Sequence, residues 1–257
     1  MANAPWDARN GVPASHRAGG AIELAPAQSV YEASTTKNHP LGTVTRAFGN
    51  WAVYCKASES LSKGKLVTAI PVLSTEDTVT VAHPIGTTAV THTASVEISA
   101  NQFEDGFLVV DEGTAAGDSY PIKSHAAIAS AAAGTINLYV GLLTAWAIAD
   151  SDITLYTSPY NVQESNTDQV EFPIGAPLID VASGSYFWCI CAAPPSFGPV
   201  LFDEACGNAS GNRVLTIGSS TAGTVEAVDA TAEAAIAQAI LNAADYEDAK
   251  YGLVAWK

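Results

Sequence analysis

The sequence predicts a mainly β protein, with a β-sandwich or barrel body, an extended N-terminal arm and little helix. Hydrophobic residues make up 48% of the chain and charged residues only 14%, so the chain can bury a substantial core. The apolar residues are largely Ala and Val, mixed with Ser, Thr and Gly, which favours strands and tight turns over long helices. Short β-rich stretches recur between turn signals, as they do in sandwiches and barrels.

Residues 1–40 are expected to form the extended arm. Seven Gly and Pro residues interrupt any regular periodicity in this stretch. Hydrophobic residues are nevertheless spaced along it like anchors, and a Gly/Ser-rich flexible linker would lack them. The arm residues that we expect to contact a partner are Trp6, Arg9, Arg17, Ile22, Leu24, Tyr31 and Lys37.

The body is expected to occupy residues 41–257, possibly as two β subdomains with a break near residues 157–175. It begins with a hairpin of residues 42–48 and 51–55. The longest apolar run, residues 138–149, is too short to cross a bilayer and is predicted to be a buried strand. Further strands are expected at residues 61–72, 90–98, 107–110, 120–123, 136–143, 153–156, 185–192, 213–217 and 224–228.

Charge is divided unevenly along the chain. Residues 1–65 hold seven basic residues and four acidic ones, a formal net charge of +3, whereas residues 66–257 hold four basic residues and twenty-two acidic ones, a net charge of −18. A charge of +3 is too weak for phosphate binding, and the acidic remainder would repel nucleic acid. The division instead suggests a docking arm followed by an acidic body that faces solvent.

Motifs that carry catalysis are missing from the sequence: it has no nucleophile elbow, phosphate-binding loop, dinucleotide fingerprint or HExxH pair. The four cysteines lack zinc spacing and are expected to be reduced and buried. His92, on the apolar face of its strand, is expected to be a core residue rather than a metal ligand. We therefore predict no catalytic site, no metal, no cofactor and no enzymatic activity.

Two segments offer an alternative ligand surface. The Gly-rich loop from Asp111 to Asp118 could hold calcium, but its spacing departs from the EF-hand loop and favours a solvated turn. Tyr186 and Trp188 could form a platform for stacking sugars, although their alternation along a strand favours core packing.

Turn glycines and strand hydrophobes together give the body a recognisable pattern. It is clearest in residues 103–125, where Phe103-Glu-Asp-Gly106 leads into Phe107-Leu-Val-Val110 and then the Gly-rich loop. Related pieces occur at residues 40–67, 153–160, 184–188 and 235–256. Over about residues 40–257, the chain resembles the capsid decoration (cement) proteins of tailed bacteriophages.

This resemblance implies a structural role. Such a protein would decorate the outer surface of an icosahedral phage head after synthesis in the host cytoplasm, and would stabilise it by bridging subunits of the major capsid protein. The expected partners are the major capsid protein and further copies of the chain in a homotrimer, with no nucleic acid and no membrane. The alternative function is a receptor- or glycan-binding module of a head or tail fibre.

The C-terminal region gives conflicting signals. Residues 230–244 are rich in Ala and include Glu233 and Gln238, and the spacing of Ile236 and Ile240 favours a helix. Residues 251–256 instead have the composition of a strand. The resemblance implies a closing strand pair, so we expect residues 234–241 to pair with residues 251–256.

Overall fold

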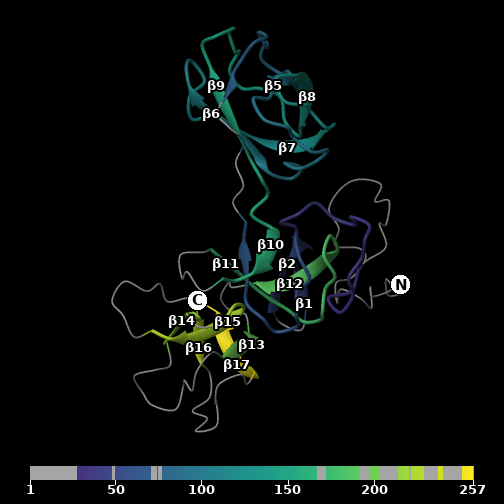
Figure 1. Cartoon of the computed structure of the whole chain (residues 1–257), viewed down its shortest axis with the longest axis vertical. Coiled ribbons are helices and arrows are strands. Elements are labelled where there is room, and N and C mark those ends of the chain that lie inside the picture. Colours follow the sequence, from purple (N-terminus) through teal and green to yellow (C-terminus); the bar gives the residue numbers. More distant parts are fainter. Residues whose placement is uncertain are drawn as a thin grey trace, which may run out of the picture. The chain divides into compact units, whose positions relative to one another are not determined.

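A computed structural model describes residues 28–47, 50–70, 74, 77–166, 172–191, 197–202, 214–219, 221–228, 237–239 and 251–256. All helix or strand structure in these residues is β, which confirms the predicted fold class. The chain divides into two compact units. Unit 1 comprises Met1–Ala69 and Tyr160–Lys257, and unit 2 comprises Ile70–Pro159. In Figure 1, unit 2 has the teal colours of the middle of the sequence, and unit 1 combines purple and blue strands with green and yellow ones.

Unit 2 is therefore an insertion into unit 1. The boundaries between the two units lie after Ala69 and after Pro159. The sequence did not predict a boundary near Ala69. The two points of insertion meet inside unit 1, because Ala69 at the end of one strand pairs with Val162 on another. This long-range strand pairing brings the two parts of unit 1 together, and local composition does not reveal it.

The first sheet of unit 1 has six strands in the order β1-β2-β10-β3-β11-β12, and β2 also pairs with β12. Their bounds are β1 Val44–Ala47, β2 Asn50–Ala57, β3 Val67–Ala69, β10 Asn161–Glu164, β11 Pro173–Pro177 and β12 Tyr186–Cys191. The register from Val44 opposite Val53 to Ala47 opposite Asn50 confirms the predicted first hairpin. Because β12 returns to β2, the strands other than β1 form a closed ring.

The second sheet of unit 1 is a closed barrel in the order β13-β15-β14-β16-β17. Its strands are β13 Phe197–Phe202, β14 Val214–Ile217, β15 Thr224–Ala227, β16 Ala237–Ala239 and β17 Tyr251–Trp256. Ala237 pairs with Trp256 in an antiparallel ladder, which confirms the predicted C-terminal strand pair in its described residues. One hydrophobic cluster joins the two sheets, with Tyr54 and Trp188 from the first and Phe202 from the barrel.

Unit 2 is built from one six-stranded antiparallel sheet in the order β4-β9-β6-β7-β8-β5. Its strands are β4 Asp77–Thr78, β5 Ala89–Thr93, β6 Phe107–Glu112, β7 Ser119–His125, β8 Ala133–Leu138 and β9 Asp152–Tyr156. The hydroxyl oxygens of Thr80 and Thr93 lie 3.0 Å apart, so the segment after β4 lies beside the end of β5. Leu108, Tyr120 and Trp146 are buried in its core.

Two strand predictions in unit 2 are wrong. The apolar run of residues 138–149 is not a buried strand, since β8 ends at Leu138 and turns follow, with Leu142 buried but Leu143 exposed. The predicted strand of residues 90–98 ends at Thr93, and Val96 is exposed. In both segments the residue pattern favours a strand, but the backbone turns and leaves some hydrophobic side chains exposed.

Both units share one local device, which recurs at irregular intervals. A buried residue forms an isolated antiparallel bridge, and the residue three positions later has a positive φ angle. The bridges pair Leu61 with Val181 in unit 1, and His83 with Trp146 and Ile98 with Ile128 in unit 2. The corresponding positive-φ residues are Gly64, Gly184, Gly86, Ala149, Asn101 and Ala131. Each bridge is closed by two reciprocal backbone hydrogen bonds, and a strand follows each turn.

Candidate interaction surfaces

The second part of the predicted arm is built into unit 1 through Gln28. This side chain is buried, and its amide nitrogen donates hydrogen bonds of 2.8 Å to the carbonyl oxygens of Glu32 and Tyr186. Its amide oxygen accepts from the Tyr54 hydroxyl at 2.7 Å and from the Asn38 side chain at 3.0 Å. All the hydrogen-bonding capacity of the buried amide is therefore used, as a buried polar group requires.

Neighbouring contacts extend this attachment. The indole Nε1 of Trp188 donates to the carbonyl oxygen of Gln28 at 2.9 Å, and Val30 lies in the hydrophobic core. Ser34 and Tyr186 exchange backbone hydrogen bonds of 2.9 and 2.7 Å. Residues 28–39 therefore belong to unit 1, which corrects the predicted end of the arm at residue 40. The anchors Trp6, Arg9, Arg17, Ile22 and Leu24 lie outside the described residues, whereas Tyr31 is exposed and Lys37 is half-buried.

An aromatic cluster surrounds this attachment point. The rings of Tyr54 and Tyr186 are stacked with centroids 6.1 Å apart, and Trp188 packs edge-on against Tyr54 at 5.0 Å. Burial raises the pKa of the Tyr54 hydroxyl, which therefore stays protonated and donates to Gln28. Trp188 is only 2% exposed, so it is a core residue and cannot offer a sugar-stacking surface.

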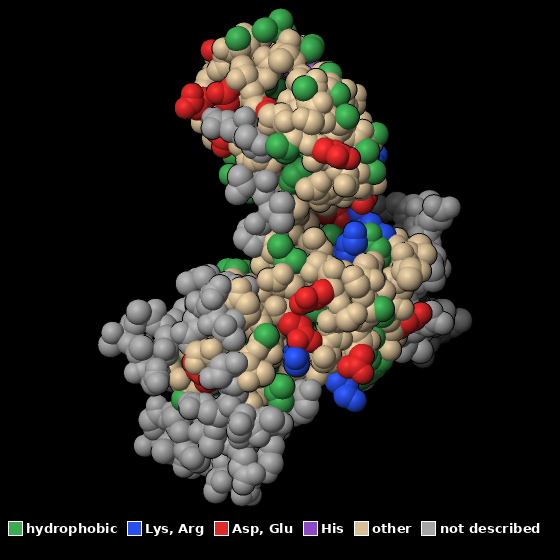
Figure 2. Space-filling view, viewed as in Figure 1, with side chains coloured by type: hydrophobic (Ala, Val, Ile, Leu, Met, Phe, Trp, Pro, Cys, Tyr) green, Lys and Arg blue, Asp and Glu red, His purple; other side chains and the backbone are tan. Residues whose placement is uncertain are grey.

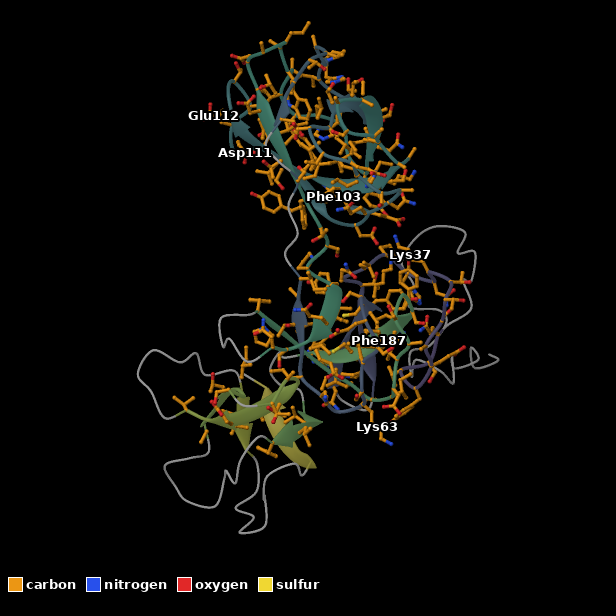
Figure 3. The ribbon with its side chains drawn as sticks, viewed as in Figure 1. Lys37, Lys63, Phe103, Asp111, Glu112 and Phe187 are labelled. Carbon is orange, nitrogen blue, oxygen red and sulfur yellow. The ribbon has the colours of Figure 1, made fainter. Side chains whose placement is uncertain are left out.

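The net positive charge of residues 1–65 does not come from the first 27 residues. Residues 1–27 contain two arginines and two carboxylates, so the positive surplus lies within residues 28–65, where the basic residues are Lys37, Arg46, Lys56, Lys63 and Lys65. Two of these pair locally: the Arg46 guanidinium lies 4.3 Å from the centre of the Trp51 ring, and Lys65 Nζ lies 2.7 Å from a carboxylate oxygen of Glu164. Figure 3 shows Lys37 and Lys63 on opposite sides of the part of unit 1 that contains Phe187, so the basic residues do not gather at one point.

The predicted ligand residues of unit 2 lie on and beside β6. Figure 3 shows Asp111 and Glu112 at the edge of the unit, pointing outward, and both are exposed. Asp118, at the other end of the loop, accepts a hydrogen bond of 2.8 Å from the Tyr120 hydroxyl. Asp111 and Asp118 thus lie in unit 2, whereas Tyr186 and Trp188 lie in unit 1. Among the described residues, no group of three or more His, Cys, Asp or Glu side chains could hold a metal ion.

Unit 2 also contains three buried histidines. His125 Nε2 accepts a hydrogen bond of 3.0 Å from the Phe103 backbone N–H, and its Nδ1 lies 2.9 Å from the carbonyl oxygen of Ala126. His83 Nε2 likewise accepts from the Thr91 backbone N–H at 3.1 Å. A ring nitrogen can accept a hydrogen bond only when it carries no proton, so these contacts place no proton on Nε2 of either ring.

His92 is a core residue, as its position on the apolar face predicts. Its Nε2 lies 3.4 Å from a carboxylate oxygen of Asp77 without hydrogen-bond geometry. Burial lowers the pKa of His92, and the Asp77 charge only partly opposes this effect. Burial also lowers the pKa of His83.

A group of exposed hydrophobic side chains marks a further surface of unit 2. Residues 79–88 run antiparallel to residues 138–151, joined by backbone hydrogen bonds that include the His83–Trp146 bridge. Exposed apolar side chains project from both segments, and we call them the apolar ladder: Val81, Ile85, Val140, Leu143 and Ile148. Sequence reasoning missed this surface because the run of residues 138–149 has the composition of a core strand.

Comparisons with protein-family models, curated proteins and solved structures give no match. The described residues include no apolar helix of the length that a bilayer requires.

Proposed function

We propose that this protein is a structural virion protein that decorates the head of a tailed bacteriophage and stabilises it by bridging subunits of the major capsid protein. The sequence resemblance over about residues 40–257 motivates the proposal, and the all-β architecture is compatible with it. Homotrimers at the threefold and quasi-threefold positions of the lattice would match the symmetry of an icosahedral head. The protein would lie on the outer surface of the capsid.

The observation that carries the proposal is the attachment of residues 28–39 to unit 1. Gln28 and Val30 fix this segment to the core of unit 1, so the capsid contacts that we propose for residues 1–27 would be joined to the body at a defined point. A short segment with hydrophobic anchors, held at one end, can add contacts on a partner surface without rearranging the body. In this arrangement residues 1–27 bind the capsid lattice.

Two truncations test this role. Deletion of residues 1–27 should leave the thermal unfolding of the body unchanged and should lower binding to expanded phage heads at least tenfold, because several anchors are lost together. Binding is measured by co-sedimentation of purified protein with heads that lack it. Deletion of residues 1–39 is the comparison, since it also removes Gln28 and should lower the unfolding temperature.

The binding measurements test two claims separately: that the protein decorates phage heads, and that residues 1–27 make the contact. Saturable binding of the full chain at a fixed number of copies per head supports decoration, and failure of the full chain to bind any such head contradicts it. Undiminished binding of the chain lacking residues 1–27 would show that the contact lies elsewhere on the molecule.

A further inference from the structure

The apolar ladder comes from two segments of unit 2 that backbone hydrogen bonds hold side by side. The carbonyl oxygen of Val79 accepts from the Ala149 N–H at 2.9 Å, and farther along the Gly86 N–H donates to the carbonyl oxygen of Leu142 at 2.9 Å. Between them, His83 and Trp146 exchange hydrogen bonds of 3.0 and 2.9 Å. These bonds hold the two segments side by side over their length, so side chains that project outward from both share one surface.

Buried and exposed side chains are interspersed along both segments. Along the first segment, Val79 and His83 are buried, whereas Val81 and Ile85 are exposed. Along the second segment, Leu142 and Trp146 are buried, but Leu143 is 74% exposed and Ile148 is 61% exposed. The register of the His83–Trp146 bridge places Val81 opposite Ile148. Single exposed hydrophobic residues are ordinary, but several from paired segments form a patch of the kind found at interaction sites.

Carboxylates lie beside the ladder at two points. The Tyr120 hydroxyl accepts from the Leu143 backbone N–H at 3.0 Å and donates to Asp118 at 2.8 Å, so one hydroxyl links Asp118 to the ladder. Asp150 follows two residues after Ile148, and it accepts bonds of 3.1 and 2.6 Å from Thr114. These bonds lower the pKa of Asp150, which therefore remains ionised under physiological conditions.

Unit 2 as a whole is negatively charged, like the carboxylates beside the ladder. Unit 2 contains one lysine and no arginine against ten acidic residues. Figure 2 shows hydrophobic and acidic side chains on the visible face of unit 2 and very little Lys or Arg. The complementary surface is therefore apolar at its centre and carries Lys or Arg at its rim. A second copy of this acidic unit, or an anionic lipid surface, would be repelled.

We propose that the apolar ladder is a second capsid-docking surface, which binds an apolar patch of the major capsid protein that is rimmed by Lys and Arg. This inference rests on the proposed function. Bridging needs at least two separate contacts, and residues 1–27 supply only one of them. The ladder gives the second contact from a different unit, and the acidic surface outside the ladder faces solvent.

Charge substitutions in the full chain test the ladder. Leu143→Asp and Ile148→Asp place carboxylates among the apolar contacts and should each weaken binding to phage heads at least tenfold in co-sedimentation titrations. Both side chains are exposed, so the variants should unfold at the wild-type temperature. Val96→Asp is the matched control, because Val96 is an exposed apolar residue of the same unit outside the ladder, and it should bind like wild type.

A salt titration and a measurement of oligomeric mass complete the experiment. Asp150→Asn should reduce the salt dependence of binding, because an ionic contact at the rim is lost. Wild-type binding by Leu143→Asp and Ile148→Asp overturns the inference but leaves the proposed function standing, whereas no binding by the wild-type chain itself contradicts that function. If the wild-type chain forms an oligomer and Leu143→Asp dissociates it, the inference is also overturned. In that case the apolar ladder binds a second copy of the chain and not the major capsid protein.

Discussion

Unit 1 and unit 2 use the same local construction for different surfaces. Both contain the bridge followed by a positive-φ turn and a strand, with Leu61 and Val181 in unit 1 and His83 and Trp146 in unit 2. The described part of unit 1 has five basic and five acidic residues, whereas that of unit 2 has one and nine. Unit 1 shows three exposed large hydrophobic side chains among its described residues, and unit 2 shows eight.

This difference teaches that backbone construction and surface chemistry vary independently. Turn geometry is set by positive-φ positions and by reciprocal backbone hydrogen bonds, and outward side chains can change without disturbing either. In unit 1, buried polar contacts around Gln28 attach an incoming segment. In unit 2, the outward positions are apolar or acidic, and the buried polar groups include three histidines. The two units should therefore respond separately to mutation and to pH.

The largest expected effect comes from truncating the core of unit 2. Trp146 is buried, with its ring 5.8 Å from that of His83 and 5.9 Å from that of Tyr120. Trp146→Ala should lower the free energy of unfolding of unit 2 by about 3–5 kcal/mol, because it leaves a cavity. Scanning calorimetry should show the unit 2 transition at lower temperature and the unit 1 transition unmoved. Phe187→Ala, in the core of unit 1, should give the reverse pattern, and a common shift of both transitions would contradict the separation.

Lowering the pH should destabilise unit 2, by less than Trp146→Ala does. The folded-state pKa values of His83 and His92 lie below their ordinary value of 6.5, so the unfolded chain binds protons first as the pH falls. Stability is therefore complete above about pH 6.5 and declines below it. The unfolding temperature of unit 2 should fall between about pH 7.5 and pH 5.

A non-titrating side chain provides the control for this pH effect. His92→Gln should make the pH dependence of unit 2 shallower, because one buried group no longer gains a proton on unfolding. Equal pH slopes for the wild-type chain and this variant would show that His92 does not contribute.

The smallest effects concern the shared turns. Gly184 has φ near 79°, and no atom lies within 4 Å of a Cβ placed there, so Gly184→Ala should cost about 1 kcal/mol of unit 1 stability through backbone strain alone. Ala149 adopts φ near 58°, and Ala149→Gly should stabilise unit 2 by about 0.5–1 kcal/mol by removing that strain. Denaturant unfolding of both variants measures the two changes. Shifts of the same sign would mean that the turns are not equivalent.

Local patterns predicted several features correctly. The first hairpin and the strands on either side of the Gly-rich loop follow from turn residues and β-rich composition, and the C-terminal pair of β16 with β17 follows from the resemblance, where composition favours a helix. His92 is buried because its strand alternates. The free end of the arm was misjudged, because no local signal shows that Gln28 finds partners on Tyr54 and Tyr186. The apolar ladder was missed because composition does not show which side chains a turn carries outward.

The sequence by itself determined that the chain forms short strands around a substantial core, and that residues 66–257 carry most of the acidic charge. Alternation, turn residues and charge act over a few neighbouring positions, so they can be read directly from the residue order. The insertion of unit 2 between β3 and β10 and the exposure of Leu143 and Ile148 follow only from the three-dimensional fold. Each of these depends on strand pairing or packing between distant residues, whose register local patterns do not specify.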